Sequence, residues 1–166
     1  RPINIIVPWS AGGSTDQVTR VVAPILAEAL GTEVVVVNQP GASGSIGTKA
    51  AMDAPRDGYT WTANAIANNA TYAVSGLLEE SNIDDYRIYL HVANAPLISV
   101  NANAPYKDFG ELMEAMKTGD VTVGTAGVTS SGGTAFATLQ DAMGGELSAR
   151  MVAYDGGNPA VIAAAS

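Results

Sequence analysis

The sequence predicts an α/β fold with parallel sheets, and three observations point to it. Short runs rich in β-branched residues alternate along the chain with stretches whose apolar residues recur at helical spacing. Strands that alternate with helices form βαβ units, in which the strands run parallel. Hydrophobic residues make up 47% of the 166 residues, which is enough for a packed core, and this length fits one domain or two small lobes.

The first half of the chain repeats the order strand, loop, helix. Its first helix has a capping box in Ser14 and Gln17, an internal Pro24 that we expect to kink it, and Gly31 as the residue that ends it. A turn at 55–58 precedes the third strand. The predicted elements are strand 3–7, a helix from residue 14, strand 33–38, helix 45–54, strand 59–63 and helix 70–78.

The second half continues in the same order. Asp108 and Glu111 form a second capping box, and Asn158 with Pro159 is typical of a helix start. The predicted elements are strands 87–92, 97–101, 121–124 and 147–153 and helices 109–118, 134–143 and 160–166. Because the chain stops inside a helical pattern without a cap, we expect the natural protein to continue beyond Ser166.

The charge balance excludes several classes of partner. The net charge is −8 and the 8 Lys and Arg residues are scattered singly, so we expect neither nucleic acid nor an anionic membrane surface as a partner. No apolar run is long enough to span a membrane, and the absence of Cys excludes disulfides and thiolate chemistry. The opening Arg1-Pro2-Ile3 leads directly into a strand, as in a mature protein whose leader has been removed.

Three glycine-rich loops share one design, because each follows a strand and leads into a helix. They are residues 8–16, 40–47 and 124–133. In open α/β sheets such loops lie at the carboxyl ends of the strands, where ligands bind. Free N–H groups and the helix dipole favour an anion there, so two facing helix starts could hold two carboxylates without an arginine. The alternative, that these are ordinary loops of an α/β domain, stays open on the residues alone.

Motifs for catalysis or metal binding are not found in the sequence. His91 is the only His and lies in a strand-like run, which favours a structural role, and a zinc site is not expected without Cys or a second His. Gly41, Gly44 and Gly47 do not have the spacing of a dinucleotide-binding loop, and no nucleophile elbow is present. We therefore predict no enzyme activity, no cofactor and no metal. The enzyme class left as an alternative is a small α/β hydrolase or transferase, which a turnover assay would test.

Five segments, in order along the chain, resemble the Bug-type receptors, which are the substrate-binding proteins of tripartite tricarboxylate transporters. Residues 5–16, which contain Pro8-Trp9-Ser10-Ala11-Gly12-Gly13, are similar to the opening signature of that family, except that Trp9 stands where Phe is commoner. The other similar segments are 37–47, 57–60, 124–133 and 154–157. The resemblance covers nearly the whole chain, although members of the family are considerably longer.

The resemblance implies a two-lobed periplasmic binding protein of the type II, Venus-flytrap kind. We assign residues 1–97 to the first lobe and 98–166 to an incomplete second lobe, as the N-terminal portion of a longer receptor. The implied function is periplasmic capture of a small organic carboxylate, with a di- or tricarboxylate favoured, for the membrane subunits of a tripartite transporter. The alternative is a ligand sensor of the same fold that feeds a signalling kinase.

The resemblance also implies where a ligand would bind. Family members hold ligand carboxylates on the first glycine-rich loop, here residues 8–16, and on the loop of the second lobe, here residues 124–133, which we call the second-lobe loop. They do so largely through backbone amides and ordered water. Asn64 to Asn68, after the third strand, would line the wall of the cleft, and Asp155 could orient an amine or hydroxyl of the ligand. The implied ligand-binding residues are Trp9, Ser10, Ala11, Gly12, Gly13, Asp16, Ala42, Ser43, Gly44, Asn64, Asn68, Thr125, Ala126, Thr129, Ser130, Ser131, Gly132 and Asp155.

Overall fold

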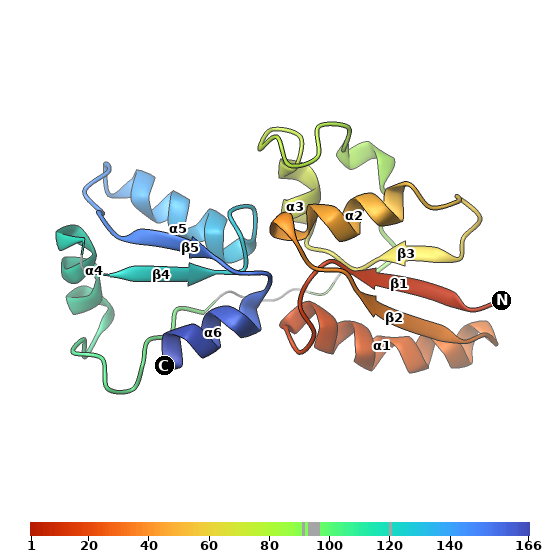
Figure 1. The fold of residues 1–166 in the computed structure, drawn as a ribbon, viewed down its shortest axis with the longest axis horizontal. Helices are drawn as coiled ribbons and strands as arrows, with labels where there is room; N and C mark the ends of the chain where they lie inside the picture. The colour runs from red at the N-terminus through yellow and green to blue at the C-terminus, as the bar shows by residue number, and fades with distance from the viewer. Residues whose placement is uncertain (91, 93–96, 120) are drawn as a thin grey trace.

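Two parallel sheets, each flanked by helices, lie end to end in this molecule (Figure 1). The computed structural model describes residues 1–90, 92, 97–119 and 121–166. In both sheets the carboxyl ends of the strands point toward the region where the two halves meet (Figure 1). We call this region the junction, and it consists of the loops 8–13, 42–44, 64–68, 125–131 and 154–157.

The first sheet has the order β2-β1-β3, with β1 (Ile3–Val7) in the centre. Both neighbours, β2 (Val34–Asn38) and β3 (Thr60–Thr62), run parallel to β1, with Ile3 opposite Val34 and Ile6 opposite Thr62. The side chains of β1 are mostly buried, as expected of a central strand that helices cover on both faces. Helix α1 (Ser14–Leu30) lies on one side of this sheet, and α2 (Ser45–Met52) and α3 (Ile66–Thr71) lie on the other (Figure 1).

The second sheet consists of β4 (Thr122–Thr125) and β5 (Arg150–Ala153), which are parallel, with Thr122 opposite Arg150. Helices α4 (Phe109–Thr118), α5 (Ser131–Ala142) and α6 (Gly157–Ala165) surround it (Figure 1). Its core brings together one face of α4, one face of α5 and the segment before β5. The buried members of this core are Leu112, Met116, Phe136, Leu147 and Ala149.

Several predicted element boundaries and caps are confirmed. Helix α1 ends at Gly31, whose left-handed conformation closes the last turn. Pro24 lies inside α1, which nevertheless continues without interruption from Ser14 to Leu30. At the start of α4 the Asp108 carboxylate accepts a hydrogen bond from the Glu111 N–H at 2.9 Å, as the capping box predicts.

Other predicted elements differ from the structure. The N-cap of α1 is Gly13 rather than Ser14, and no side chain caps the helix. Gln17 Nε2 donates to the Gly12 carbonyl and forms no capping box. Helix α3 spans Ile66–Thr71 where we predicted 70–78, and α5 begins at Ser131, three residues earlier than predicted. The described residues of 87–92 and 97–101 are irregular rather than strands, and His91 lies outside the described residues.

The division into lobes at residue 97 stays a prediction, since residues 93–96 beside it are outside the described residues. Short η1 (Ala42–Gly44) and η2 (Ile83–Asp85) turns complete the first half. Among the helices that the structure describes, none is long and apolar enough to cross a membrane.

Candidate ligand-binding site

Five of the described helices begin at the junction, one of them α3, which follows β3 and begins at Ile66. In the first half α1 follows β1 and α2 follows β2, and in the second half α5 follows β4 and α6 follows β5. The first N–H groups of each helix have no acceptor within the helix, and the helix dipole adds positive potential at the same end. The junction therefore gathers backbone donors from both halves of the molecule (Figure 1).

The first loop is held in place by Asp16, which is only 2% exposed. One carboxylate oxygen accepts the Gly12 N–H at 2.8 Å, and the other accepts Asn38 Nδ2 at 2.8 Å. The Arg20 Nε group lies 3.0 Å from both oxygens. Asp16 thus ties the glycine loop to the carboxyl end of β2 and to the second turn of α1.

These contacts determine the charge state of Asp16. The bond from the Arg20 guanidinium, together with those from Gly12 and Asn38, lowers the pKa of the Asp16 carboxyl to about 2 against the opposing effect of burial. Because its oxygens are already occupied by protein donors, the carboxylate has little capacity left for a ligand. The structure places Asp16 behind the loop that we predicted as a binding element.

The second loop, residues 40–47, has an unusual backbone. Ala42 and Ser43 have positive φ angles of 45° and 55°, which non-glycine residues seldom adopt, and Gly44 follows at 86°. The Tyr72 hydroxyl donates to the Ser43 carbonyl at 3.1 Å and is completely buried. A Cβ on Gly44 would lie 2.8 Å from the Tyr72 hydroxyl oxygen, so the close contact requires glycine.

The Asn64 side chain connects the first loop to the residues that hold the second loop. Its Oδ1 accepts the Trp9 indole N–H at 3.1 Å and the Ala65 N–H at 2.9 Å. Its Nδ2 lies within 3.0 Å of the Thr48 hydroxyl and the Tyr72 hydroxyl. The Asn64 amide is therefore used within the protein, and the network holds Trp9 against the second loop.

The second-lobe loop is organised around Ser130, the N-cap of α5. Its hydroxyl accepts the Gly133 N–H at 3.1 Å and donates to the Gly127 carbonyl at 2.7 Å. The Thr125 hydroxyl lies 3.3 Å from the Gly127 N–H. Gly127 has a φ of 131°, and a Cβ there would lie 2.4 Å from Ser43 Oγ of the other half. Only glycine allows the second loop and the second-lobe loop to approach this closely.

Direct contacts join the two halves across the junction. The Ser10 N–H and hydroxyl both donate to the Asp155 carbonyl, at 2.9 and 2.7 Å. Asn68 Nδ2 donates to the Thr129 hydroxyl at 2.9 Å. Asn68 and Thr129 are both buried, at 1% and 5% exposed. The two halves therefore contact one another directly, and the loops that carry Ser10, Ser43 and Asn68 each meet a residue of the other half.

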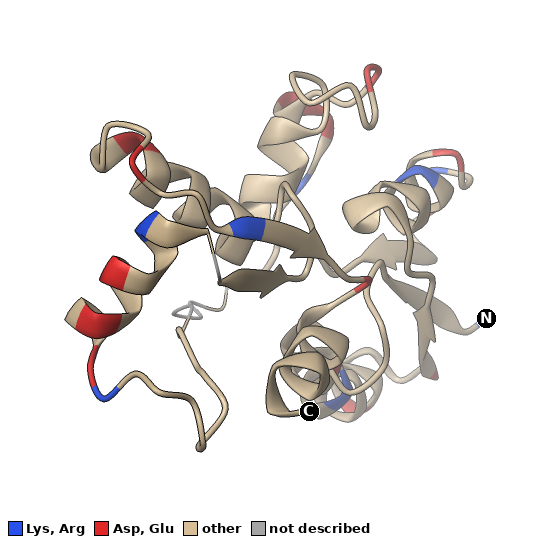
Figure 2. Ribbon diagram, turned by 60° about the vertical axis from the view of Figure 1, so that its left-hand side comes forward, with Lys and Arg blue, Asp and Glu red and all other residues tan. Residues whose placement is uncertain are grey.

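The junction carries almost no charge. Its five loops contain no Lys or Arg, and Asp155, whose side chain is exposed, is their only charged residue. Lys and Arg are scattered singly over the rest of the molecule (Figure 2). Among the described residues, no group of His, Cys, Asp and Glu could hold a metal ion. The donors available to an anion here are thus backbone N–H groups and neutral side chains.

The structure brings the predicted residues together but gives them different surroundings. Ala11, Gly12, Ala42 and Ser131 are on the surface of the junction or half-buried, whereas Asp16 and Asn64 support the loops from behind. Gly13, Ser43, Gly44, Ala126 and Ser130 belong to the loops, whereas Thr125 is the last residue of β4 and Gly132 lies in the first turn of α5. Sequence reasoning missed Asn38, Thr48 and Tyr72, which hold the loops. Tyr72 had no signal beyond its position in a predicted helix.

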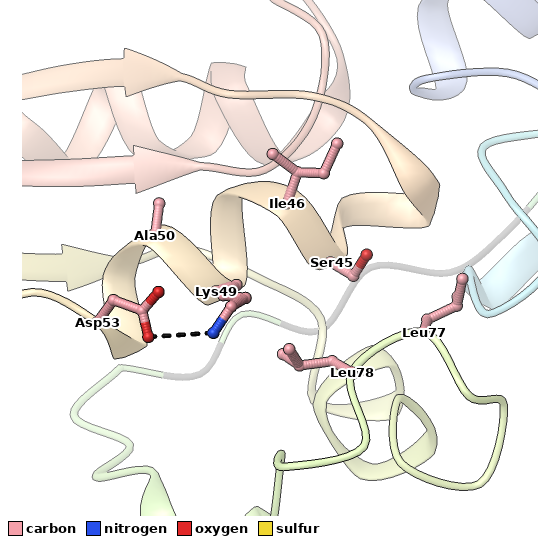
Figure 3. Close-up of a pocket in the computed structure, with 7 residues that line it drawn as sticks. All are labelled: Ser45, Ile46, Lys49, Ala50, Asp53, Leu77 and Leu78. Carbon is pink, nitrogen blue, oxygen red and sulfur yellow. Dashed lines mark hydrogen bonds and ion pairs between the residues drawn. The ribbon is translucent and has the colours of Figure 1, made fainter.

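A hollow lies away from the junction, between α2 and the segment after α3. It encloses about 390 Å³. Figure 3 shows Lys49 pointing toward Asp53, and the Lys49 ammonium also bonds Glu80 at 2.8 Å. Since two carboxylates surround this one ammonium group, the hollow is a poor place for an anion. Its lining residues are Ser45, Ile46, Lys49, Ala50, Asp53, Leu77 and Leu78.

Curated proteins similar in sequence to this chain include UPF0065 and Bug proteins. A UPF0065 protein of Agrobacterium vitis is 32% identical over 163 residues, covering 96% of this chain and 46% of the relative. Protein BugT of Bordetella pertussis is 36% identical over 124 residues, covering 73% of this chain and 30% of BugT. The chain thus spans about half the length, or less, of these curated relatives.

Solved structures have the same fold. MatC of Rhodopseudomonas palustris with bound malate superposes with a TM-score of 0.81 at 22% identity, over 99% of this chain and 56% of MatC. A periplasmic transporter superposes with a TM-score of 0.76 at 28% identity, over 98% of this chain and 55% of its own. The two sheets therefore represent a periplasmic binding protein fold. The family model of the tripartite tricarboxylate transporter family receptor matches residues 18–165, and this chain therefore belongs to that receptor family.

Proposed function

We propose that this protein is an extracytoplasmic receptor that binds a small organic carboxylate at the junction and delivers it to the membrane subunits of a tripartite transporter. The observation that supports this most directly is that helix N-termini from opposite halves meet at a site without Lys or Arg. The loop before α1 bonds the loop before α6 through Ser10 and Asp155, and the loop before α2 approaches the loop before α5 at Ser43 and Gly127. Helix starts of this kind bind carboxylate groups through backbone N–H donors. Two such helix starts can each bind one carboxylate group of an acid that has two.

Backbone donors are strong enough for this task. A hydrogen bond to a charged group contributes about 1.5–3 kcal/mol. Four or five such bonds, less the cost of association, reach roughly −8 kcal/mol, which corresponds to about micromolar affinity. An acidic protein can therefore hold an anion without an opposing cationic side chain.

The ligands of related structures agree with the proposed class. MatC was solved with malate, and another R. palustris protein of the same fold, 22% identical to this chain, was solved with adipate. Both ligands are dicarboxylates. We therefore place a di- or tricarboxylate first among the candidate ligands of this chain, with Ser10 to Gly13 and Thr125 to Gly132 as its binding loops.

A thermal-shift screen against organic acids, followed by calorimetry, tests the proposal. The matched control for each dicarboxylate is its diamide, which has the same shape without charge. We expect stabilisation by at least one acid and none by its diamide. A folded sample, free of bound ligand, that no carboxylate stabilises would contradict the proposal.

Two substitutions at the first position of α5 test the role of the backbone. Ser131→Pro removes one N–H, and proline fits here because the preceding Ser130 has an extended backbone, with ψ of 161°. Ser131→Ala keeps the N–H and removes only the hydroxyl. We expect the proline variant to bind about tenfold more weakly than the alanine variant, since one charge-assisted bond is lost. Equal affinities would exclude this N–H as a ligand donor.

A further inference from the structure

Asn68 has an unused hydrogen-bond acceptor inside the junction. Its side chain is 1% exposed, and its Nδ2 donates to the Thr129 hydroxyl of the other half at 2.9 Å. Its Oδ1 is buried and has no hydrogen-bond partner in the part of the chain that the structure describes. A buried carbonyl oxygen without a donor is unfavourable, so this atom favours any group that can donate to it.

The position of Asn68 links this acceptor to the start of α5. Its partner Thr129 directly precedes Ser130, the N-cap of α5, whose first N–H groups have no acceptor in the helix. Asn68 is therefore a side chain of the first half that bonds the residue directly before this helix start. Two independent features, a helix start and an unpaired buried acceptor, thus meet at one place.

The nearby Asn64 shows why Asn68 is the residue with spare capacity. Asn64 Oδ1 already accepts from the Trp9 indole and from the Ala65 N–H. Its amide therefore stabilises the loops and has no acceptor to offer. Asn68, by contrast, uses its donor across the junction and keeps its acceptor free.

We propose that Asn68 selects acids that carry a hydrogen-bond donor, a hydroxyl or an ammonium, on the carbon next to a carboxylate. This inference rests on the proposed function and specifies its substrate class. An unsubstituted acid leaves Asn68 Oδ1 unpaired when the halves close, whereas a 2-hydroxy or 2-amino acid supplies the missing donor. The neutral amide offers this acceptor without the repulsion that a carboxylate side chain would exert on the ligand.

Matched pairs of acids test the selection. Calorimetry with malate and succinate, and with 2-hydroxyglutarate and glutarate, compares ligands that differ by one hydroxyl. For the unmodified protein we expect the hydroxy acid of a pair to bind about tenfold more tightly, as sites with a buried polar group discriminate against analogues that lack its partner. This comparison needs no variant, and equal affinities within both pairs would overturn the inference.

Variants then assign the selection to Asn68. In Asn68→Leu, which has similar size and no acceptor, we expect the ratio of affinities to fall to about one, because the hydroxyl no longer finds its partner. The control is Thr62→Val, which removes another buried oxygen without a partner and should leave the ratio unchanged. A hydroxy-acid preference that persists in Asn68→Leu would refute the role of Asn68.

The outcomes separate this inference from the proposed function. Binding of both acids in a pair with equal affinity supports a carboxylate receptor and overturns the role of Asn68. If no acid of either pair, and none in the wider screen, binds to folded protein, both proposals are wrong. Tighter binding of the hydroxy acids in the unmodified protein and a ratio near one in Asn68→Leu support both.

Discussion

Replacing Asp16 by Asn tests whether this buried carboxylate anchors the first glycine loop. The substitution keeps the shape of the side chain but removes its charge, and the new amide N–H would face one of three existing donors, from Gly12, Arg20 or Asn38. A pKa lowered from 3.8 to about 2 corresponds to roughly 2 kcal/mol of stabilisation by the charged form. Because the Arg20 side chain is half exposed, solvent screening keeps the expected loss near 2 kcal/mol rather than the 3–5 kcal/mol typical of a fully buried pair.

The same shift predicts how this loss depends on pH. The pKa of Asp16 is lower in the folded than in the unfolded protein, so its contribution is fully present above about pH 5 and is lost as the pH falls toward 2. At pH 3 about half of it, roughly 1 kcal/mol, should remain. The free-energy difference between the unmodified protein and Asp16→Asn should therefore narrow by about 1 kcal/mol between pH 7 and pH 3.

Urea unfolding of both proteins at pH 7, 5, 4 and 3 measures this difference directly. Thermal unfolding at pH 7 should show a lower Tm by about 4–8 °C for a chain of this length. The control is Asp53→Asn, because Asp53 is an exposed partner of Lys49 and should change stability little at any pH. An Asp16→Asn loss of the same size at pH 3 and at pH 7 would show that the charge of Asp16 is not what stabilises the loop.

Three further substitutions test the contacts of the junction and of the outer helices. In Gly127→Ala the new methyl group would lie 2.4 Å from Ser43 Oγ, so we expect the affinity for any bound acid to fall about tenfold or more in calorimetry. The control is Gly58→Ala, whose methyl group would meet nothing within 4 Å and should leave the ligand affinity unchanged. Tyr72→Phe removes the hydroxyl bond to the second loop and should lower the unfolding free energy in urea by about 1–2 kcal/mol; an unchanged midpoint would show that the loop holds itself. Asp108→Ala removes the N-cap of α4 and should cost about 1 kcal/mol in the same measurement without changing ligand affinity.

The parts of the fold that the sequence predicted well are those where local patterns and packing agree. The run Ile3 to Val7 is apolar throughout and becomes the buried central strand β1. In α1 the agreement is weaker. Val21 and Ile25 continue the predicted apolar stripe but are more than 60% exposed, whereas Thr19 and Ala23 are buried. The apolar face of α1 is therefore wider than the part of the helix that packs against the sheet in the structure. Periodicity alone does not show which part of an apolar face is buried.

The candidate site was predictable in its loops but not in its supports. Glycine-rich segments between strands and helices mark the loops, because their backbone geometry requires particular residues. The network of Asn38, Thr48 and Tyr72 has no such local signal, since these residues meet the loops only through tertiary folding. The same holds for the pairing of Asn68 with Thr129, which lie 61 positions apart in the chain.

The division between loops and side chains has a consequence for selectivity. Backbone N–H groups at a helix start offer the same donors whatever the surrounding side chains, so in the proposed function the loops of the junction would select an anion without selecting which one. Long-range attraction cannot add selectivity, because the protein carries a net charge of −8 and the junction loops contain no cationic residue. In the proposed function, discrimination between acids of equal charge would therefore come from the few neutral side chains that have an unused donor or acceptor. Among the described residues of the junction, Asn68 is the buried side chain that meets this condition.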